Sequence, residues 1–113
     1  MINISSVHEL TPTRFSAPHG MSKGGMLLLM RELALEYSRF GITVNNVAPG
    51  AIHTDINQEV LADPAYEAKV IAKIPAGLIG EPEDVSKAVL FPCAKEARYV
   101  TGTSIVIDGG LAR

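Results

Sequence analysis

The sequence predicts an α/β fold, a parallel sheet of about three strands layered with helices. Three segments rich in β-branched residues have the length of strands: residues 2–4, 42–48 and 103–107. The segments between them carry helix-forming residues with start and stop signals. This alternation favours a parallel sheet, because each crossover between parallel neighbours needs a long connection. No repeat or linker divides the chain, so residues 1–113 are predicted to form a single domain.

The longest predicted helix covers residues 20–40, and Gly41 follows where a helix stop belongs. Glu32, Glu36 and Arg39 are spaced to form one polar stripe along it. The rest of its circumference is apolar, which is more than one-sided packing requires. Such a helix is either deeply buried in its own domain or also covered by a partner subunit.

The remaining helices are predicted from their first turns. Residues 11–18 are predicted to be a loop, because they contain several Thr, Ser and Pro residues. A short helix is expected to begin at Asp63, which can cap it, with Pro64 in the first helical position. Residues 81–84 place acidic side chains and Pro at the start of another helix, which Pro92 should end or kink.

Composition limits the possible classes of function. The apolar fraction is 47%, the charged fraction 19% and the formal net charge -2, with no cluster of basic residues. These values are typical of a globular protein and argue against a disordered tail or a nucleic-acid binder. No segment is long enough to span a bilayer or resembles a secretory signal, so a cytoplasmic location is expected. The single Cys93 excludes an intrachain disulfide and a multi-cysteine zinc site.

Three side chains form a candidate site by their spacing. His19 and Lys23 lie four residues apart at the beginning of the long helix and therefore share a face. Ser6 ends the first strand, and parallel sheets bind ligands at the carboxyl ends of their strands. A hydroxyl, an imidazole and an ammonium group can together perform acid/base chemistry. The alternative is a capping Ser, a solvated loop His and a surface Lys, and spacing alone leaves both open.

Four sequence blocks resemble the short-chain dehydrogenase/reductase family, in the family's order and at its spacing. The blocks are residues 3–6 (NISS), 22–25 (SKGG), 44–50 (VNNVAPG) and 100–110 (VTGTSIVIDGG). The resemblance covers essentially the whole chain. It implies the C-terminal part of a Rossmann-like doubly wound parallel sheet, with the first βαβ units missing. Residues 48–52 are similar to members that oxidise sugars or reduce 3-oxoacyl thioesters.

The resemblance also implies roles for the candidate residues. In the family a catalytic Ser precedes a Tyr-x-x-x-Lys motif by thirteen residues, which matches Ser6 and Lys23 and places His19 at the Tyr position. Ser6 would bind the substrate oxygen, and Lys23 would hold the nicotinamide ribose. The substrate would be a small alcohol or ketone.

The cofactor implied by the resemblance is NAD or NADP. The turn formed by Pro49 and Gly50 would approach its nicotinamide end, together with Ile52 and Thr54. The sequence contains no Gly-x-x-x-Gly-x-Gly turn, the family's element for the pyrophosphate. We therefore expect a truncated domain that binds dinucleotides poorly by itself.

The substitution at the tyrosine position has a further consequence. Imidazole titrates near neutral pH, but the ring of His19 is shorter than a phenol. Loss of general acid/base transfer lowers rates by about 10²–10⁴-fold, so we expect an inactive or strongly impaired enzyme. The alternative is a non-catalytic module that docks, or forms a homo-oligomer, through the helix of residues 20–40.

Overall fold

The computed structural model describes residues 1–113 and contains one three-stranded parallel sheet. The strands are β1 (Ile2–Ile4), β2 (Asn45–Pro49) and β3 (Ser104–Ile107), in the spatial order β1-β2-β3. Ile4 pairs with Val47, and Val47 pairs with Ile105. The predicted α/β fold class is therefore confirmed, with β2 in the centre and β1 on an open edge.

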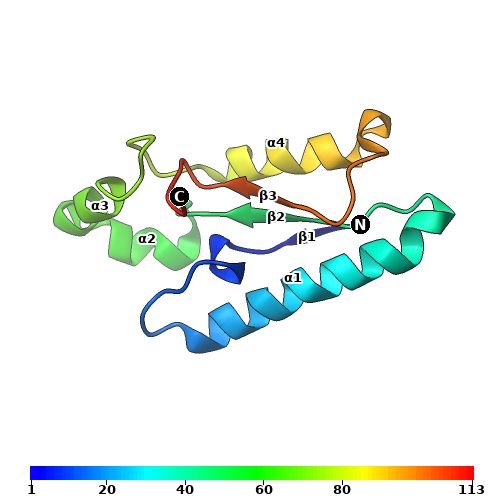
Figure 1. Ribbon diagram of the computed structural model, residues 1–113. Coiled ribbons are helices and arrows are strands. Elements are labelled where there is room, and N and C mark those ends of the chain that lie inside the picture. Colours follow the sequence, from blue (N-terminus) through cyan, green and yellow to red (C-terminus); the bar gives the residue numbers. More distant parts are fainter.

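Helices cover both faces of this sheet. Helix α1 (Ala17–Tyr37) lies along one face and α4 (Pro82–Cys93) along the other (Figure 1). The short helices α2 (Asp55–Leu61) and α3 (Pro64–Ile71) lie beyond the carboxyl ends of the strands (Figure 1). Three 3₁₀ turns complete the chain: η1 (Val7–Glu9), η2 (Ser38–Phe40) and η3 (Lys95–Ala97).

Helix α1 begins earlier than predicted. Pro18 belongs to its first turn rather than to the preceding loop, because a helix leaves its first N–H groups unpaired and Pro is tolerated there. The α-helix ends at Tyr37, and η2 continues it to Phe40. Gly41 then has a φ of 73°, so the predicted stop is confirmed.

Strand β2 and helix α2 also differ from the prediction. Strand β2 begins at Asn45 instead of residue 42, because Val44 N–H donates to the Thr101 hydroxyl (3.0 Å) before the ladder starts. Helix α2 was not predicted. Helix α3 begins as expected, with Asp63 accepting a hydrogen bond from Ala65 N–H (2.9 Å). Helix α4 ends one residue after Pro92, in agreement with the prediction.

The core between α1 and the sheet is small. Its buried cluster consists of Leu27, Met30, Ala34 and Val44. Only one row of α1 is thus buried, and apolar side chains elsewhere on the helix are exposed, including Leu35 at 83%. Deep burial of this helix within its own chain, one of the two alternatives that the sequence left open, is therefore wrong for these 113 residues.

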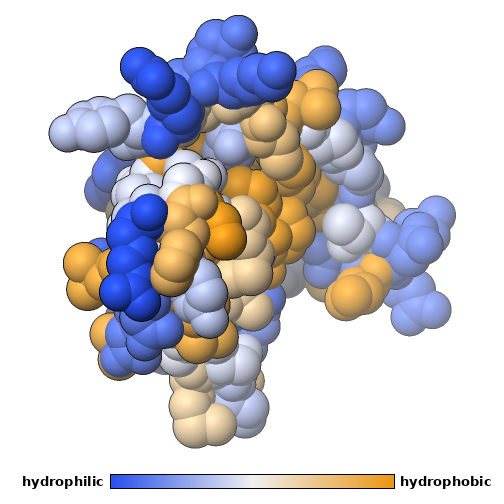
Figure 2. All heavy atoms as spheres, turned by 90° about the vertical axis from the view of Figure 1, so that its right-hand side faces the viewer, coloured by the Kyte–Doolittle hydropathy of each residue, from blue (hydrophilic) through white to orange (hydrophobic).

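The chain exposes more surface than its mass requires. A compact domain of 12.0 kDa is expected to expose about 6,000 Å², whereas this chain exposes 7712 Å². Its radius of gyration is 15.2 Å, against about 13 Å expected for this length. Figure 2 shows hydrophobic atoms on an exposed face, between hydrophilic margins. The excess of about 1,700 Å² is comparable with the total area of a standard protein interface.

A polar network is buried between the sheet and η1. Asn3 Nδ2 donates to Asn46 Oδ1 (3.0 Å), and Asn46 Nδ2 donates to Glu9 Oε2 (3.0 Å). Asn46 is fully buried and Glu9 is 8% exposed. The other carboxylate oxygen of Glu9, Oε1, has no hydrogen-bond partner, and no Lys or Arg forms a salt bridge with it. A buried carboxylate with an unpaired oxygen is costly, so this network lowers the stability of the isolated chain.

Replacing Glu9 by Gln is expected to stabilise the chain by about 1 kcal/mol. The Gln carbonyl oxygen retains the hydrogen bond from Asn46, while the buried charge disappears. Urea unfolding of both proteins measures the change. Glu59→Gln is the matched control, because Glu59 is exposed and the same substitution there should leave the stability unchanged. A less stable Glu9→Gln variant would show that the carboxylate is satisfied in solution.

Candidate active site

A cavity of about 840 Å³ opens at the carboxyl ends of the strands. Its volume lies within the range of small-molecule sites. Strand ends, the first turns of α1 and helices α2 and α3 all contribute to its wall. All the residues that the sequence singled out for catalysis or cofactor binding line it: Ser6, His19, Lys23, Pro49, Gly50, Ile52 and Thr54. The structure therefore brings together side chains that are up to 48 positions apart in the sequence (Ser6 to Thr54).

Ser6 follows β1 and caps η1. Its hydroxyl oxygen accepts a hydrogen bond from His8 N–H at 3.2 Å. This is the capping role that the sequence offered as an alternative, but it uses only an acceptor position of the hydroxyl. The O–H proton has no partner within the chain and remains available to a ligand oxygen. Capping and substrate binding are therefore compatible.

Lys23 is held against the open edge of the sheet. Its Nζ donates to the backbone oxygen of Ile4 at 3.1 Å. The ammonium group has three N–H donors, so two remain for a ligand. The side chain is half-buried, which restricts where those donors can point.

His19 lies at the mouth of the cavity and is exposed. Its backbone oxygen accepts a hydrogen bond from the Ser22 hydroxyl (2.8 Å), whereas no hydrogen bond holds its ring. The ring of His8 packs edge-on against it, with ring centroids 5.7 Å apart and planes at 77°. The imidazole ring has one nitrogen that donates and one that accepts a hydrogen bond, so proton transfer remains available at this position.

His8 is one of the polar cavity residues that sequence reasoning missed. Its Nδ1 lies 2.9 Å from the backbone oxygen of Thr11, and the side chain is half-buried. The available signal was its position two residues after Ser6, where a turn that leaves a strand end brings side chains back to the same site.

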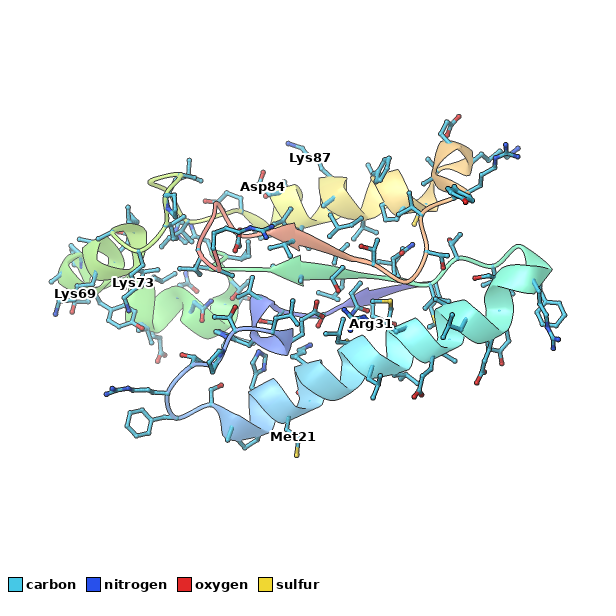
Figure 3. All side chains as sticks on the ribbon, viewed as in Figure 1. Met21, Arg31, Lys69, Lys73, Asp84 and Lys87 are labelled. Carbon is cyan, nitrogen blue, oxygen red and sulfur yellow. The ribbon has the colours of Figure 1, made fainter.

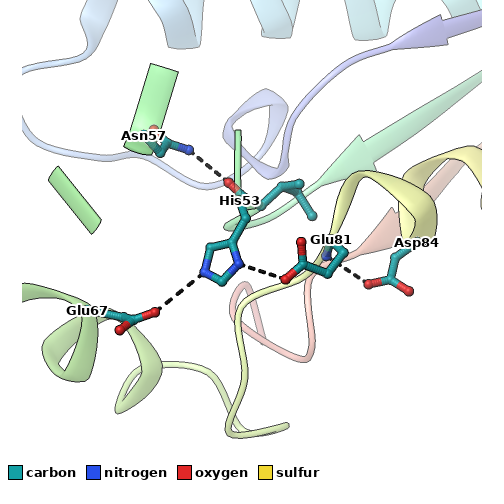
Figure 4. A network of polar contacts seen from close by, with 6 residues as sticks. His53, Asn57, Glu67, Glu81 and Asp84 are labelled. Atoms are coloured by element: carbon teal, nitrogen blue, oxygen red, sulfur yellow. Dashed lines mark hydrogen bonds and ion pairs between the residues drawn. The ribbon is translucent and has the colours of Figure 1, made fainter. Parts of the chain in front are cut away.

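The segment containing α2 and α3 forms one wall of the cavity and makes polar contacts with its neighbouring segments. Asn57 Nδ2 donates to the Ile52 backbone oxygen at 3.0 Å. His53 Nδ1 donates to Glu81 at 2.7 Å, and its Nε2 lies 3.6 Å from Glu67 of α3 (Figure 4). His53 thereby links α3 to the start of α4 through exposed contacts.

The cavity fits the nicotinamide end of a dinucleotide. Pro49 and Gly50 line the cavity at the end of β2, and Lys23 retains free donors for ribose hydroxyls. The 113 residues offer no glycine-rich turn for a pyrophosphate. No group of three or more His, Cys, Asp or Glu side chains is arranged to hold a metal ion. No helix is both long enough and apolar enough to cross a membrane.

Doubly wound α/β domains bind their ligands in such a cavity, at the carboxyl ends of parallel strands. A family model described as enoyl-(acyl carrier protein) reductase matches residues 1–112. The 3beta-hydroxysteroid dehydrogenase 1 of Eggerthella lenta is 47% identical over 98% of this chain, and glucose 1-dehydrogenase 2 of Bacillus subtilis is 39% identical over 98%. The chain belongs to the short-chain dehydrogenase/reductase family, as its motifs predicted.

Solved structures agree with this assignment. The gluconate 5-dehydrogenase of Burkholderia cenocepacia, in complex with NADP and tartrate, superposes with a TM-score of 0.92 at 30% identity. It matches 97% of this chain and 43% of its own length. A 4-hydroxyisoleucine dehydrogenase complexed with NADH has a TM-score of 0.94 at 29% identity over 97% of this chain and 45% of its own. The chain likewise spans 42% and 43% of the two sequence relatives.

Proposed function

We propose that this chain carries the substrate and nicotinamide side of an alcohol/carbonyl oxidoreductase site. The observation that carries the proposal is the single cavity lined by all seven predicted site residues. The bound cofactor, NAD or NADP, supplies a hydride acceptor or donor. A small alcohol or ketone is the substrate, and a cytoplasmic location remains a prediction.

Side chains of the cavity bind the substrate and the ribose and exchange the proton. The free O–H of Ser6 donates a hydrogen bond to the substrate oxygen, and Lys23 binds ribose hydroxyls through its two unused donors. His19 exchanges the proton of the substrate hydroxyl with water at the mouth of the cavity. The ring of His19 is exposed and not held by a hydrogen bond, so we expect turnover about 10²–10⁴-fold below that of a site with a fixed proton-transfer group.

Nicotinamide mononucleotide tests the cofactor side of this proposal, because it lacks the adenylate half for which the chain has no glycine-rich turn. We expect a saturating concentration to raise the thermal midpoint, since a ligand stabilises the state that binds it. NAD and NADP should give a similar shift. Circular dichroism at increasing nucleotide concentrations measures it.

The variant Lys23→Met is expected to abolish this thermal shift, because the ribose loses its ammonium donors. Lys87→Met is the matched control. Lys87 lies on α4 and points away from the sheet (Figure 3), so its removal should leave the shift intact. An equal shift in wild type and Lys23→Met, or no shift in wild type, would contradict the proposed site.

A second candidate function is docking through the helix of residues 20–40, onto a second copy or another subunit. The excess surface of about 1,700 Å² favours it, as do the exposed Leu28 and Leu29 of α1. The open edge of β1 adds unpaired backbone groups, which also favour association. Light scattering with size-exclusion chromatography tests this function. A monodisperse monomer with a sharp unfolding transition would rule it out.

A further inference from the structure

The hydrogen bond of His8 fixes the tautomer of its ring. A backbone carbonyl oxygen can only accept, so the contact of Nδ1 with Thr11 O at 2.9 Å requires that Nδ1 carries the proton. In the neutral ring Nε2 is then an unprotonated acceptor. Nδ1 is already occupied, so Nε2 is the ring nitrogen that His8 can offer to the cavity it lines.

Two other side chains of the cavity, Ser6 and Lys23, offer free donors to a ligand. Ser6 has its O–H free, because its oxygen already accepts from His8 N–H. Lys23 has two free N–H groups, and the Asn57 amide already donates to the Ile52 backbone oxygen. These donors suit a substrate carbonyl or alkoxide oxygen and the ribose, and no hydrogen bond within the chain joins one of them to His8 Nε2.

A ligand with a single hydroxyl has one O–H proton, and in the proposed function that proton goes to His19, so it is not available to His8. If its oxygen accepts from Ser6, His8 Nε2 remains without a donor in a half-buried position, which is unfavourable. A second hydroxyl on the carbon next to the reacting one provides the missing donor. A site built to hydrogen-bond a hydroxyl discriminates against analogues that lack it.

We propose that His8 determines substrate specificity, selecting polyols with a hydroxyl next to the reacting one. This inference rests on the proposed function and names the substrate class of the same site. His8 acts as a hydrogen-bond acceptor for the second hydroxyl, while Ser6 and His19 act on the first. The half-buried position of His8 sets the expected preference at about threefold to tenfold in affinity, the range of one net hydrogen bond.

The test compares trans-1,2-cyclohexanediol with cyclohexanol, which have the same ring and differ by one hydroxyl. Titrations are followed by ¹H–¹⁵N spectra of the full chain, with nicotinamide mononucleotide absent and then saturating. The wild type is expected to bind the diol about threefold to tenfold more tightly. Long-range ¹⁵N spectra at alkaline pH are expected to show His8 with the proton on Nδ1.

The variant His8→Asn is expected to bind diol and alcohol equally. Its amide retains a donor near Thr11 but is too short to place an acceptor at the position of Nε2. The control His53→Asn should keep the preference, because His53 does not line this cavity. A wild type without a preference, a proton on Nε2, or a preference that survives His8→Asn would overturn the inference.

Binding of nicotinamide mononucleotide distinguishes failure of the His8 inference from failure of the proposed function. Binding of nicotinamide mononucleotide without any diol preference leaves the oxidoreductase proposal standing and removes the role of His8. A diol preference without nucleotide binding contradicts the oxidoreductase proposal and leaves a polyol-binding cavity. If His8→Asn does not fold, the wild-type preference and the His8 tautomer still decide the inference.

Discussion

Replacing Met30 by Ala is expected to lower the stability of the chain by about 2–5 kcal/mol. Met30 is fully buried at the centre of the cluster that joins α1 to Val44, the residue before β2. Truncation removes apolar contacts and leaves a cavity that the small core cannot close. Each kcal/mol corresponds to about 4–8 °C in a domain of this size, so the thermal midpoint should fall by about 10 °C or more. Thermal and urea unfolding by circular dichroism measure this loss.

Met21→Ala provides a matched control on the same helix. Met21 is 77% exposed and points away from the sheet (Figure 3), so the same truncation should change the stability by less than about 0.5 kcal/mol. Equal effects at the two positions would contradict the packing of α1 described here. They would instead indicate that α1 is covered by a partner on the face that bears Met21.

The main elements of the fold are predictable because their signals are local. The β-branched segments, the Pro64 and Pro82 starts and the Gly41 stop act within a few residues of the backbone that they shape. Helix α2 has a weaker signal, Thr54 at its N-cap position and Asp55 in its first turn. Its N-cap residue, Thr54, makes no side-chain capping bond, and none of its residues is buried. Neither a formed side-chain cap nor a buried face therefore marks this helix in the sequence.

The candidate site is predictable where a residue belongs to a motif, as Ser6 and Lys23 do. His8 belongs to none of the motifs, and its tautomer depends on a carbonyl three residues away that only the η1 turn brings into reach. Asn46 looks like an ordinary member of a strand segment in the sequence. A polar residue in the central strand of a parallel sheet, where apolar residues predominate, is a usable signal for a buried network.

Replacing Gly50 by Ala is expected to destabilise the chain by about 1–3 kcal/mol and to weaken nucleotide binding. A Cβ atom at this position would lie 2.6 Å from Asp108 Cβ and 2.9 Å from Asp108 Cα. Asp108 cannot move aside easily, because its carboxylate accepts hydrogen bonds from Gly110 N–H and Ala112 N–H, both at 2.8 Å. The strain therefore falls on the turn after β2, which forms part of the cavity wall.

The same substitution at Gly25 is expected to have the opposite sign. Gly25 lies within α1, and a Cβ there meets nothing within 4 Å. Ala restricts the unfolded chain and favours the helix, so Gly25→Ala should stabilise by about 0.4–1 kcal/mol. Urea unfolding and the thermal shift with nicotinamide mononucleotide are measured for both variants. If Gly50→Ala retains the stability and the shift of wild type, the close approach of β2 to Asp108 does not shape the nucleotide site. If only Gly50→Ala loses stability and the thermal shift, the close spacing of β2 and Asp108 is required for nucleotide binding in the cavity.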